Sequence, residues 1–485
     1  MQGQSRGNDM PYKNERIKKR RGLVMRKLAK TMALVLAGSM LLTGCGGGSK
    51  PAETTKAAAD GSKAETTQAA AQGETAKAAS GENVTLTLWA DFVTPERTKY
   101  VETMVENYMG EHPNVKIEVT PLPDSADDKI MTAYEAGQGP DIFLSSGPDI
   151  TSHINGEYVI PLDTYFDNWD KKDLLLPAAI ETVRQYDVTG NNQLYYIPNG
   201  ISFTVLWVRS DWLKETNSTV DTWDNLFQAV ENMTDKDQGR YGLSIRGGKG
   251  GAKFLERMMY AYSGILSVFD ENGKCTINDP KNVEFVERYL GLYGKCTAEG
   301  DLNYGWTELA AAFDSGAAGM IIHNLGSASN HMEAFGGDQT KFEAIGMPLN
   351  DKGTSVNLMI QPGGMTISST CKNPDEAFDF ITYMTTGEPV SEYCQQWGVV
   401  PVDQDVLENA KWIDDQPWYE SSADLLLDDN TLFYNQYSWL PGHDDIYGEM
   451  DTDSQYIMTG EMTAQEMLDK WAAYYQECYD KFYNK

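Results

Sequence analysis

The stretch Val84-Thr85-Leu86-Thr87-Leu88-Trp89 alternates apolar and polar residues and predicts a β-strand with one buried face. The apolar spacing and the Gly and Pro breaks after it predict a helix over 96–109, a strand over 115–119, a helix over 127–136 and a strand over 141–144. This strand–helix–strand–helix–strand series indicates right-handed crossovers and a mainly parallel sheet, which is an α/β fold.

Ligand-contacting residues are expected beyond the carboxyl ends of these strands, where open α/β sheets bind their ligands. Trp89, Asp91 and Phe92 close or follow the first strand, and Ser145 and Ser146 follow the third. We expect all five to contact a ligand. The alternative for the first three is packing within their loop.

The rest of the chain predicts more elements of the same kinds. Thr222 is a candidate N-cap for a helix that starts at Trp223, which we expect to be a packing residue. A glycine-rich run over 246–251 lacks the Gly-Lys-Ser/Thr ending of a phosphate loop and is either a flexible binding loop or a connector. The other expected elements are strands over 202–208, 241–245, 356–360 and 365–368, a helix end, turn and strand over 313–322, a helix capped by 373–375 and an amphipathic helix over 463–479.

Further candidates for ligand contact lie in this second half. Each was chosen for one of four reasons. Some follow a predicted strand, and the glycines have no side chain and so let a ligand approach the backbone closely. Others present an aromatic face or carry a positive charge that suits an acidic ligand. In chain order they are Arg246, His323, Asn324, Gly363, Gly364, Trp397 and Trp439.

A secretion signal precedes this body. Basic residues over 26–30 lead into an apolar run over 32–42, which is too short for a permanent membrane helix of about 20 residues. The run ends in Leu42-Thr43-Gly44-Cys45, which resembles the bacterial lipobox, whose cysteine becomes the acylated first residue of the mature chain. We therefore expect 1–45 to be a lipoprotein signal peptide and Cys45 to hold the protein on the extracellular face of the cell membrane. Either the n-region is extended or Met25 is the true start.

Residues 46–82 predict a tether. They are almost entirely Gly, Ala, Ser, Thr, Glu, Lys and Gln, with no aromatic residue. Such a composition cannot bury enough surface to offset the entropy of ordering the chain, so we expect a disordered linker between the lipid and the body.

The body from residue 83 onward is long enough for two or three domains. The whole chain carries 40 basic and 71 acidic residues, and the first 45 residues are mainly basic, so the body is strongly acidic. This charge argues against nucleic acid or anionic lipid as its partner. The 11 Trp and 26 Tyr suit stacking on sugar rings, although most of them will fill the core or the surface.

The five cysteines after Cys45 form no C-x-x-C pair, and the chain has only five His, so we expect no zinc site and assign no metal-ligating residue. An odd count leaves at least one thiol free unless it pairs between chains. Two disulfides stay open as alternatives, Cys275–Cys296 and Cys371–Cys394, because the compartment permits them. Neither alternative includes Cys478. The acidic pairs Asp428-Asp429 and Asp444-Asp445 are expected to be solvated loops, with calcium binding as the alternative.

Five short motifs follow one another along the body. They are Tyr196-Ile197-Pro198, Thr222-Trp223-Asp224-Asn225-Leu226, Phe313-x-x-Gly316-x-x-Gly319-Met320, Asn373-Pro374-Asp375-Glu376-Ala377, and the run from Thr459-Gly460-Glu461 to Glu466-Met467-Leu468. Each motif is degenerate alone, but the ordered set resembles the family 1 extracellular solute-binding proteins, the group that contains the maltose-binding protein. The chain departs from that group at His323-Asn324, where members often carry Asn-Gly.

The resemblance implies a two-lobed α/β fold of periplasmic-binding-protein type II, with a hinge and the ligand between the lobes. One lobe would comprise 83–198 and 361–403, and the other 199–360 and 404–485. It implies a monomer without a cofactor that captures a carbohydrate and delivers it to an ABC permease. Oligosaccharides are favoured because the aromatic residues suit stacking on sugar rings, and polyols, aminosugars and acidic sugars stay open as alternatives. A ligand that favours the closed form shifts the open and closed populations, and the permease then recognises the closed form.

Two other functions remain open at this point. A binding protein of the same fold could serve a sensor kinase instead of a permease. A lipid-anchored glycoside hydrolase would need two carboxylates flanking one bond, and a chain this acidic offers such candidates everywhere, so the sequence does not single out a pair.

Overall fold

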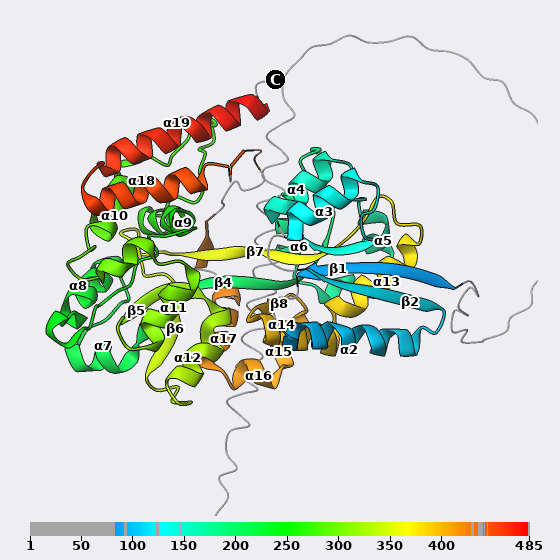
Figure 1. Ribbon diagram of the computed structural model, residues 1–485, viewed down its shortest axis with the longest axis horizontal. Helices are drawn as coiled ribbons and strands as arrows, with labels where there is room; N and C mark the ends of the chain where they lie inside the picture. The colour runs from blue at the N-terminus through cyan, green and yellow to red at the C-terminus, as the bar shows by residue number, and fades with distance from the viewer. Residues whose placement is uncertain are drawn as a thin grey trace, which may run out of the picture.

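The computed structural model describes residues 83–91, 95–122, 126–145, 147–427, 431–434, 440, 442–443 and 445–483. Figure 1 shows two bodies side by side, joined by two long strands, β4 (Ile197–Arg209) and β7 (Ser355–Ile367), that run through both. Among the described residues, no helix combines the length and apolar character needed to cross a bilayer. The signal peptide and linker expected over 1–82, with Cys45, lie outside this part of the chain.

The first body, called the N-lobe here, begins with the predicted strand–helix–strand–helix–strand series, and all five elements are confirmed. They are β1 (Val84–Asp91), α2 (Pro95–Glu111), β2 (Val115–Leu122), α3 (Ala126–Glu135) and β3 (Ile142–Ser145). β1 lies between β2 and β3 and runs parallel to both. Leu86 and Leu88 are fully buried, as the alternating pattern predicts.

The prediction of a mainly parallel sheet is confirmed for β1, β2 and β3 and wrong for the sheet as a whole, which continues into the second body, called the C-lobe. Within the described residues the strand order is β2-β1-β3-β7-β4-β5, and every pair between β3 and β5 is antiparallel. The reason is that β4 runs from the N-lobe into the C-lobe and β7 returns beside it. Two further strands also pair with β4 in the antiparallel direction. They are β6 (Phe342–Ile345), beside the C-lobe end of β4, and β8 (Val400–Pro401), beside Gly200 and Ile201.

The crossing strands come together because of glycine. We expected two strands over 356–360 and 365–368, but β7 is continuous through Gly363 and Gly364. A β-carbon on Gly364 would lie 2.0 Å from the carbonyl oxygen of Ile197, so only glycine lets β4 and β7 approach here. The pairing of β4 with β7 shifts register between Pro198 and Gly200 and again between Gly200 and Ser202.

Helices cover both lobes (Figure 1). The further N-lobe helices are α4 (Gly147–Asn155), α5 (Asp163–Asn168), α6 (Pro177–Arg184), α13 (Pro374–Thr385) and α14 (Gly387–Trp397). The C-lobe helices are α7 (Ser210–Thr216), α8 (Trp223–Met233), α9 (Gly251–Ser263), α10 (Pro280–Leu290), α11 (Trp306–Asp314), α12 (Ala328–Ala334), α18 (Tyr447–Thr459) and α19 (Ala464–Tyr483), beside β5 (Met320–Asn324). The connecting stretch after β8 holds α15 (Gln404–Asn409), α16 (Lys411–Asp414), α17 (Pro417–Leu427) and β9 (Thr431–Phe433).

Several local predictions for the C-lobe are confirmed. The hydroxyl of Thr222 caps α8 by accepting a hydrogen bond from Asn225 N at 3.2 Å. Trp223 is buried and packs edge-on against Phe285, with ring centres 5.3 Å apart. The C-terminal amphipathic helix is α19, and the side chains of Thr463 and Glu466 bond each other's backbone N–H groups ahead of it.

Other local predictions are wrong. Residues 241–245 form no strand beyond a single bridge at Tyr241. Ser244 N still bonds Met320 O at 3.0 Å, but the N–H of Ile245 donates to the carboxylate of Asp301 instead of a neighbouring strand. Asn373 stands before α13 but makes no side-chain capping bond, and Pro374 begins the helix. The two disulfides left open are absent, since all five cysteines in the described part of the chain are free thiols.

The lobes also meet away from the crossing strands, at two glycines. Gly398 ends α14 with φ +68, and a β-carbon there would lie 2.2 Å from the Cα of Gly326 in the C-lobe. A β-carbon on Gly326 would in turn lie 3.2 Å from the carbonyl oxygen of Trp397. Backbone therefore rests directly on backbone at this point, which leaves no room for a side chain.

We predict that Gly398→Ala costs more stability than Gly460→Ala. Both glycines end helices with positive φ, but nothing lies within 4 Å of a β-carbon built on Gly460. Each substitution should cost about 1–2 kcal/mol for the left-handed backbone. Only Gly398→Ala should add about 1–3 kcal/mol of overlap between the lobes. Chemical denaturation measures both, and equal losses would contradict the interlobe contact.

Candidate ligand-binding cleft

A cavity of about 800 Å³ lies between the lobes, toward the upper end of the range for ligand pockets. The N-lobe contributes Arg97 from α2 and Trp397 from α14. The C-lobe wall is formed by α11, β5, the short 3-10 helix η4 (Leu325–Ser327) and α12. Its lining residues are Trp306, Thr307, Ala310, Ala311, Asp314, His323, Asn324, Gly326, Ser327, Asn330, Glu333 and Ala334.

The N-lobe wall is an aromatic corner with a cation on it. The Trp397 ring stacks on Tyr393, one helical turn earlier, with ring centres 4.4 Å apart, and meets the edge of Tyr100 at 5.7 Å. The guanidinium carbon of Arg97 lies 4.6 Å from the centre of the Trp397 ring. Because these rings support one another, the indole is held in place before any ligand arrives.

The C-lobe wall contains a second stack, of His323 on Trp306. The two ring centres are 3.5 Å apart, and Nε2 of His323 lies 3.2 Å from the carbonyl oxygen of Trp306. Burial lowers the pKa of His323 to about 3, so the ring is neutral. The backbone oxygen of Asn324 next to it accepts from Trp207 Nε1 at 3.1 Å and from the hydroxyl of Ser327 at 2.9 Å, which fixes the end of β5 at the cavity.

Trp306 is supported from behind by the glycine-rich run 246–251. The guanidinium carbon of Arg246 lies 5.1 Å from the Trp306 ring centre, and burial lowers the Arg246 pKa. Gly247 N donates to Asp301 O at 2.9 Å, and the Asp451 carboxylate accepts from Gly250 N at 2.7 Å. Because its backbone is tied down in this way, the run is a connector, which was the second of its two predicted roles. The Asp301 carboxyl, whose pKa burial raises to about 7, anchors the loop before Trp306.

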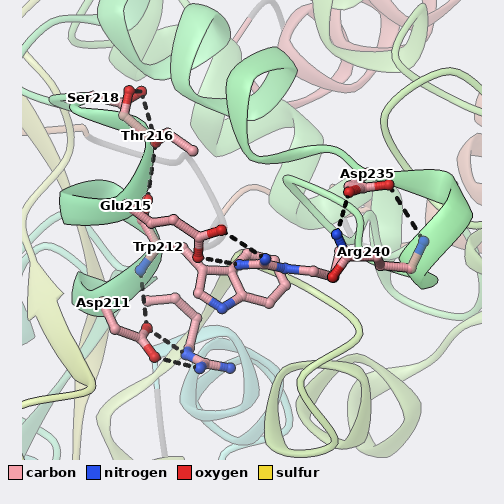
Figure 2. Close-up of polar contacts among 9 residues, drawn as sticks. Asp211, Trp212, Glu215, Thr216, Ser218, Asp235 and Arg240 are labelled. Atoms are coloured by element: carbon pink, nitrogen blue, oxygen red, sulfur yellow. Dashed lines mark hydrogen bonds and ion pairs between the residues drawn. The ribbon is translucent and has the colours of Figure 1, made fainter.

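Two other hollows do not suit a solute. The one beside Arg246 holds about 10 Å³, room for a single water at most. The other, of about 380 Å³, lies beside α7 and α8, and three of its charged groups, Glu215, Asp235 and Arg240, already have partners (Figure 2). Arg240 is bonded to both carboxylate oxygens of Glu215 and stacks on Trp212 at 3.9 Å. No group of three or more His, Cys, Asp and Glu within the described ranges could hold a metal ion.

Three of the twelve predicted ligand contacts, His323, Asn324 and Trp397, come together on the cavity wall. Other candidates lie elsewhere in the fold. Arg246 lies behind Trp306, and Trp89 is half-buried against the N-lobe core. Ser145 of β3 pairs with Gly364 of β7, and Gly363 precedes Gly364 in the same strand. Phe92, Ser146, Trp439 and the side chain of Asp91 lie outside what the structure describes.

Sequence reasoning missed Trp306, Arg97 and Asp314. Trp306 begins a helix directly after Gly305, and an aromatic residue at a helix start has no local mark of a binding role. Arg97 is one cation in an otherwise ordinary amphipathic helix, and only the fold brings it to Trp397. The one usable signal was the proximity of Trp306 to the motif that contains Phe313 and Met320.

The lowered pKa of His323 predicts a pH-dependent stability. Above about pH 6.5 the ring is neutral in both the folded and the unfolded chain, and its contribution is fully present. As the pH falls from about 6.5 toward 3, the unfolded chain takes up a proton that the folded protein excludes, so stability is lost by up to about 1.4 kcal/mol per pH unit. The stability advantage of the unaltered protein over His323→Gln, from urea unfolding, should shrink between about pH 7 and pH 4. A constant difference would contradict a buried neutral ring.

Comparisons with known proteins identify the family. A family model described as bacterial extracellular solute-binding protein matches residues 94–389. A putative ABC transporter periplasmic-binding protein of Escherichia coli (strain K12) is 21% identical over 358 residues, covering 70% of this chain and 77% of that protein. A maltotriose-binding protein of Pyrococcus abyssi is 22% identical over 339 residues, covering 68% of this chain and 69% of that protein.

A solved structure gives the same answer for the fold. The solute-binding protein of an ABC transporter from Thermotoga lettingae, bound with alpha-D-tagatose, matches with a TM-score of 0.68 at 19% identity. The match covers 82% of this chain and 100% of that one, and it confirms the predicted two-lobed α/β fold. Because the family model spans more than half of the sequence, the chain belongs to the bacterial extracellular solute-binding proteins.

Proposed function

We propose that the protein captures a carbohydrate, an oligosaccharide in particular, between its lobes and delivers it to an ABC permease. The interlobe cavity of about 800 Å³ carries the proposal, because an aromatic corner on one wall faces hydroxyl and amide side chains on the other. Aromatic faces stack on sugar rings, and side chains such as Asn324 and Ser327 suit their hydroxyl groups. The maltotriose-binding relative and the tagatose-bound structure support the same class of ligand.

Capture would work by closure about the crossing strands. We infer lobes of 83–198 with 361–403 and of 199–360 with 404–485. The register shifts of β4 at Pro198, Gly200 and Ser202 support a hinge there, because irregular pairing lets a strand bend at low cost. Sugar bound to one wall gains the contacts of the other wall only in the closed form, so it shifts the population toward closure.

The family consists of binding proteins, and we infer that this member performs no chemistry on its ligand. In the cleft, the Asp314 carboxylate is already bonded by His331 at 2.5 Å, and Glu333 is exposed to solvent. Glycoside hydrolysis requires two carboxyl groups that flank the scissile bond, whereas Asp314 is engaged by its histidine partner. We therefore propose that the ligand reaches a permease intact, which the ABC transporter relative supports.

A thermal-shift screen of mono- and oligosaccharides tests the ligand class. We expect oligosaccharides to raise the melting temperature, since a ligand that binds only the folded protein stabilises it. A rise with a peptide or a polyamine and with no carbohydrate would overturn the sugar assignment.

Substitution of a cleft residue tests where the ligand binds. Trp397→Ala should weaken binding of the best sugar about tenfold, the loss of a stacking contact of about 1.4 kcal/mol. Trp169→Ala, which removes a half-buried indole packed on Phe378 in the same lobe, is the matched control. Isothermal titration should show unchanged affinity for the control. Equal weakening by both variants would mean that Trp397 acts only through stability.

We further propose that Cys45 carries the lipid that keeps the protein beside its permease on the extracellular face of the membrane. The lipobox-like stretch Leu42-Thr43-Gly44-Cys45 supports this, as does the extracellular character of the family. Expression of the full chain with Cys45→Ser should move the protein from the membrane fraction into the medium. Retention of the variant in the membrane fraction would show that something other than this lipid holds it.

A further inference from the structure

The cavity between the lobes runs along the whole of α11. Five residues of that helix line it, Trp306, Thr307, Ala310, Ala311 and Asp314, which is one continuous helical face from the first residue to the last. At 1.5 Å per residue, this face is about 12 Å long. The cavity is thus longer than a single sugar ring, and its far end is marked by Asp314.

Small side chains form the middle of this wall. Ala310 and Ala311 of α11, Ala334 of α12 and Gly326 all line the cavity. A flat ring can lie against such a surface without displacing a long side chain. The charged groups on the lining come from different elements: Arg97, beside Trp397, from α2 of the N-lobe, Asp314 from the last residue of α11, and Glu333 from α12.

Asp314 is held from inside the protein by His331. Nδ1 of the buried His331 ring lies 2.5 Å from Oδ1 of Asp314. The ring is enclosed by aromatic side chains, with Trp207 at 4.8 Å and Phe313 at 4.9 Å between ring centres. His331 therefore fixes the orientation of a carboxylate that is 20% exposed and borders the cavity.

We propose that Asp314, oriented by His331, binds the distal unit of an oligosaccharide whose other end lies against Trp397. The inference rests on the proposed function. It adds that the ligand has more than one sugar unit and that Asp314 binds the unit farthest from Trp397. An ionised carboxylate only accepts hydrogen bonds, so it suits the hydroxyl groups of a neutral sugar and repels a uronate. Because the carboxylate is oriented beforehand, the ligand does not have to order it, and the contact is the stronger for that. His331 is a positioning residue, since it does not border the cavity itself.

The alternative is that the pair only ties α11 to α12. The two cases differ in how affinity depends on ligand length. A structural tie affects every ligand alike, whereas a contact with a distal sugar unit matters only for chains long enough to reach it.

Calorimetric titration with matched di-, tri- and tetrasaccharides of the maltose, mannobiose and xylobiose series decides between them. In the series that binds, the unaltered protein should bind the tetrasaccharide more tightly than the disaccharide. Asp314→Asn should weaken the tetrasaccharide by about tenfold to a hundredfold, the usual cost of a hydrogen bond to a charged group, and leave the disaccharide unchanged. Asp167→Asn, an exposed carboxylate on α5 of the other lobe, is the control and should change neither.

Variants of His331 test the positioning. His331→Leu removes the donor and should reproduce the length-dependent loss. His331→Asn places an amide N–H near the position of Nδ1 and should restore part of the tetrasaccharide affinity, which a purely structural effect would not do.

The outcomes distinguish a wrong assignment of Asp314 from a wrong ligand class. Equal weakening of all lengths by Asp314→Asn, or no change at any length, would overturn the assignment of Asp314 while leaving sugar binding intact. If no series binds the unaltered protein, the proposed function fails and this inference fails with it.

Discussion

The pairing of β4 with β7 is the constraint on which the rest of the molecule depends. The two strands carry the sheet from one lobe into the other, and they can pair only because Gly364 leaves room for the carbonyl of Ile197. Their antiparallel course fixes where β3, β5 and β6 join the sheet, and so where each lobe's helices lie (Figure 1). The cleft is a consequence of this arrangement, since its two walls belong to bodies that are continuous through these strands.

Each wall of the cleft is built around a stack of rings that is complete without a ligand. Trp397 rests on Tyr393, and Trp306 is covered by His323 and supported by Arg246. The histidine of the second stack is neutral, because burial lowers the pKa of His323. Rings fixed in this way lose little entropy when a ligand docks, which favours binding of flat apolar sugar faces.

The sequence predicted what is encoded locally. The alternation at Val84 to Trp89 and the helical spacing after it gave every element up to β3, because burial of one face leaves its period in the residues themselves. It could not predict that Ile245 N bonds the distant Asp301 carboxylate, so that 241–245 forms no strand. Nor could it predict that β7 runs unbroken through two glycines. In the cleft, His323 and Asn324 followed from their place after a predicted strand, and Trp397 from its aromatic side chain. Arg97 and Trp306 are set by contacts between residues far apart in the chain.

The central claim is that the ligand lies in the cleft between the lobes, against Trp397 and Asn324. A crystal structure of the protein grown with the oligosaccharide that binds it tests this most directly. The account predicts a sugar ring stacked on the Trp397 indole, with sugar hydroxyls within hydrogen-bonding distance of Asn324 and with the lobes closed around it. A sugar bound on any other surface, with the cleft open and without ligand, would contradict it.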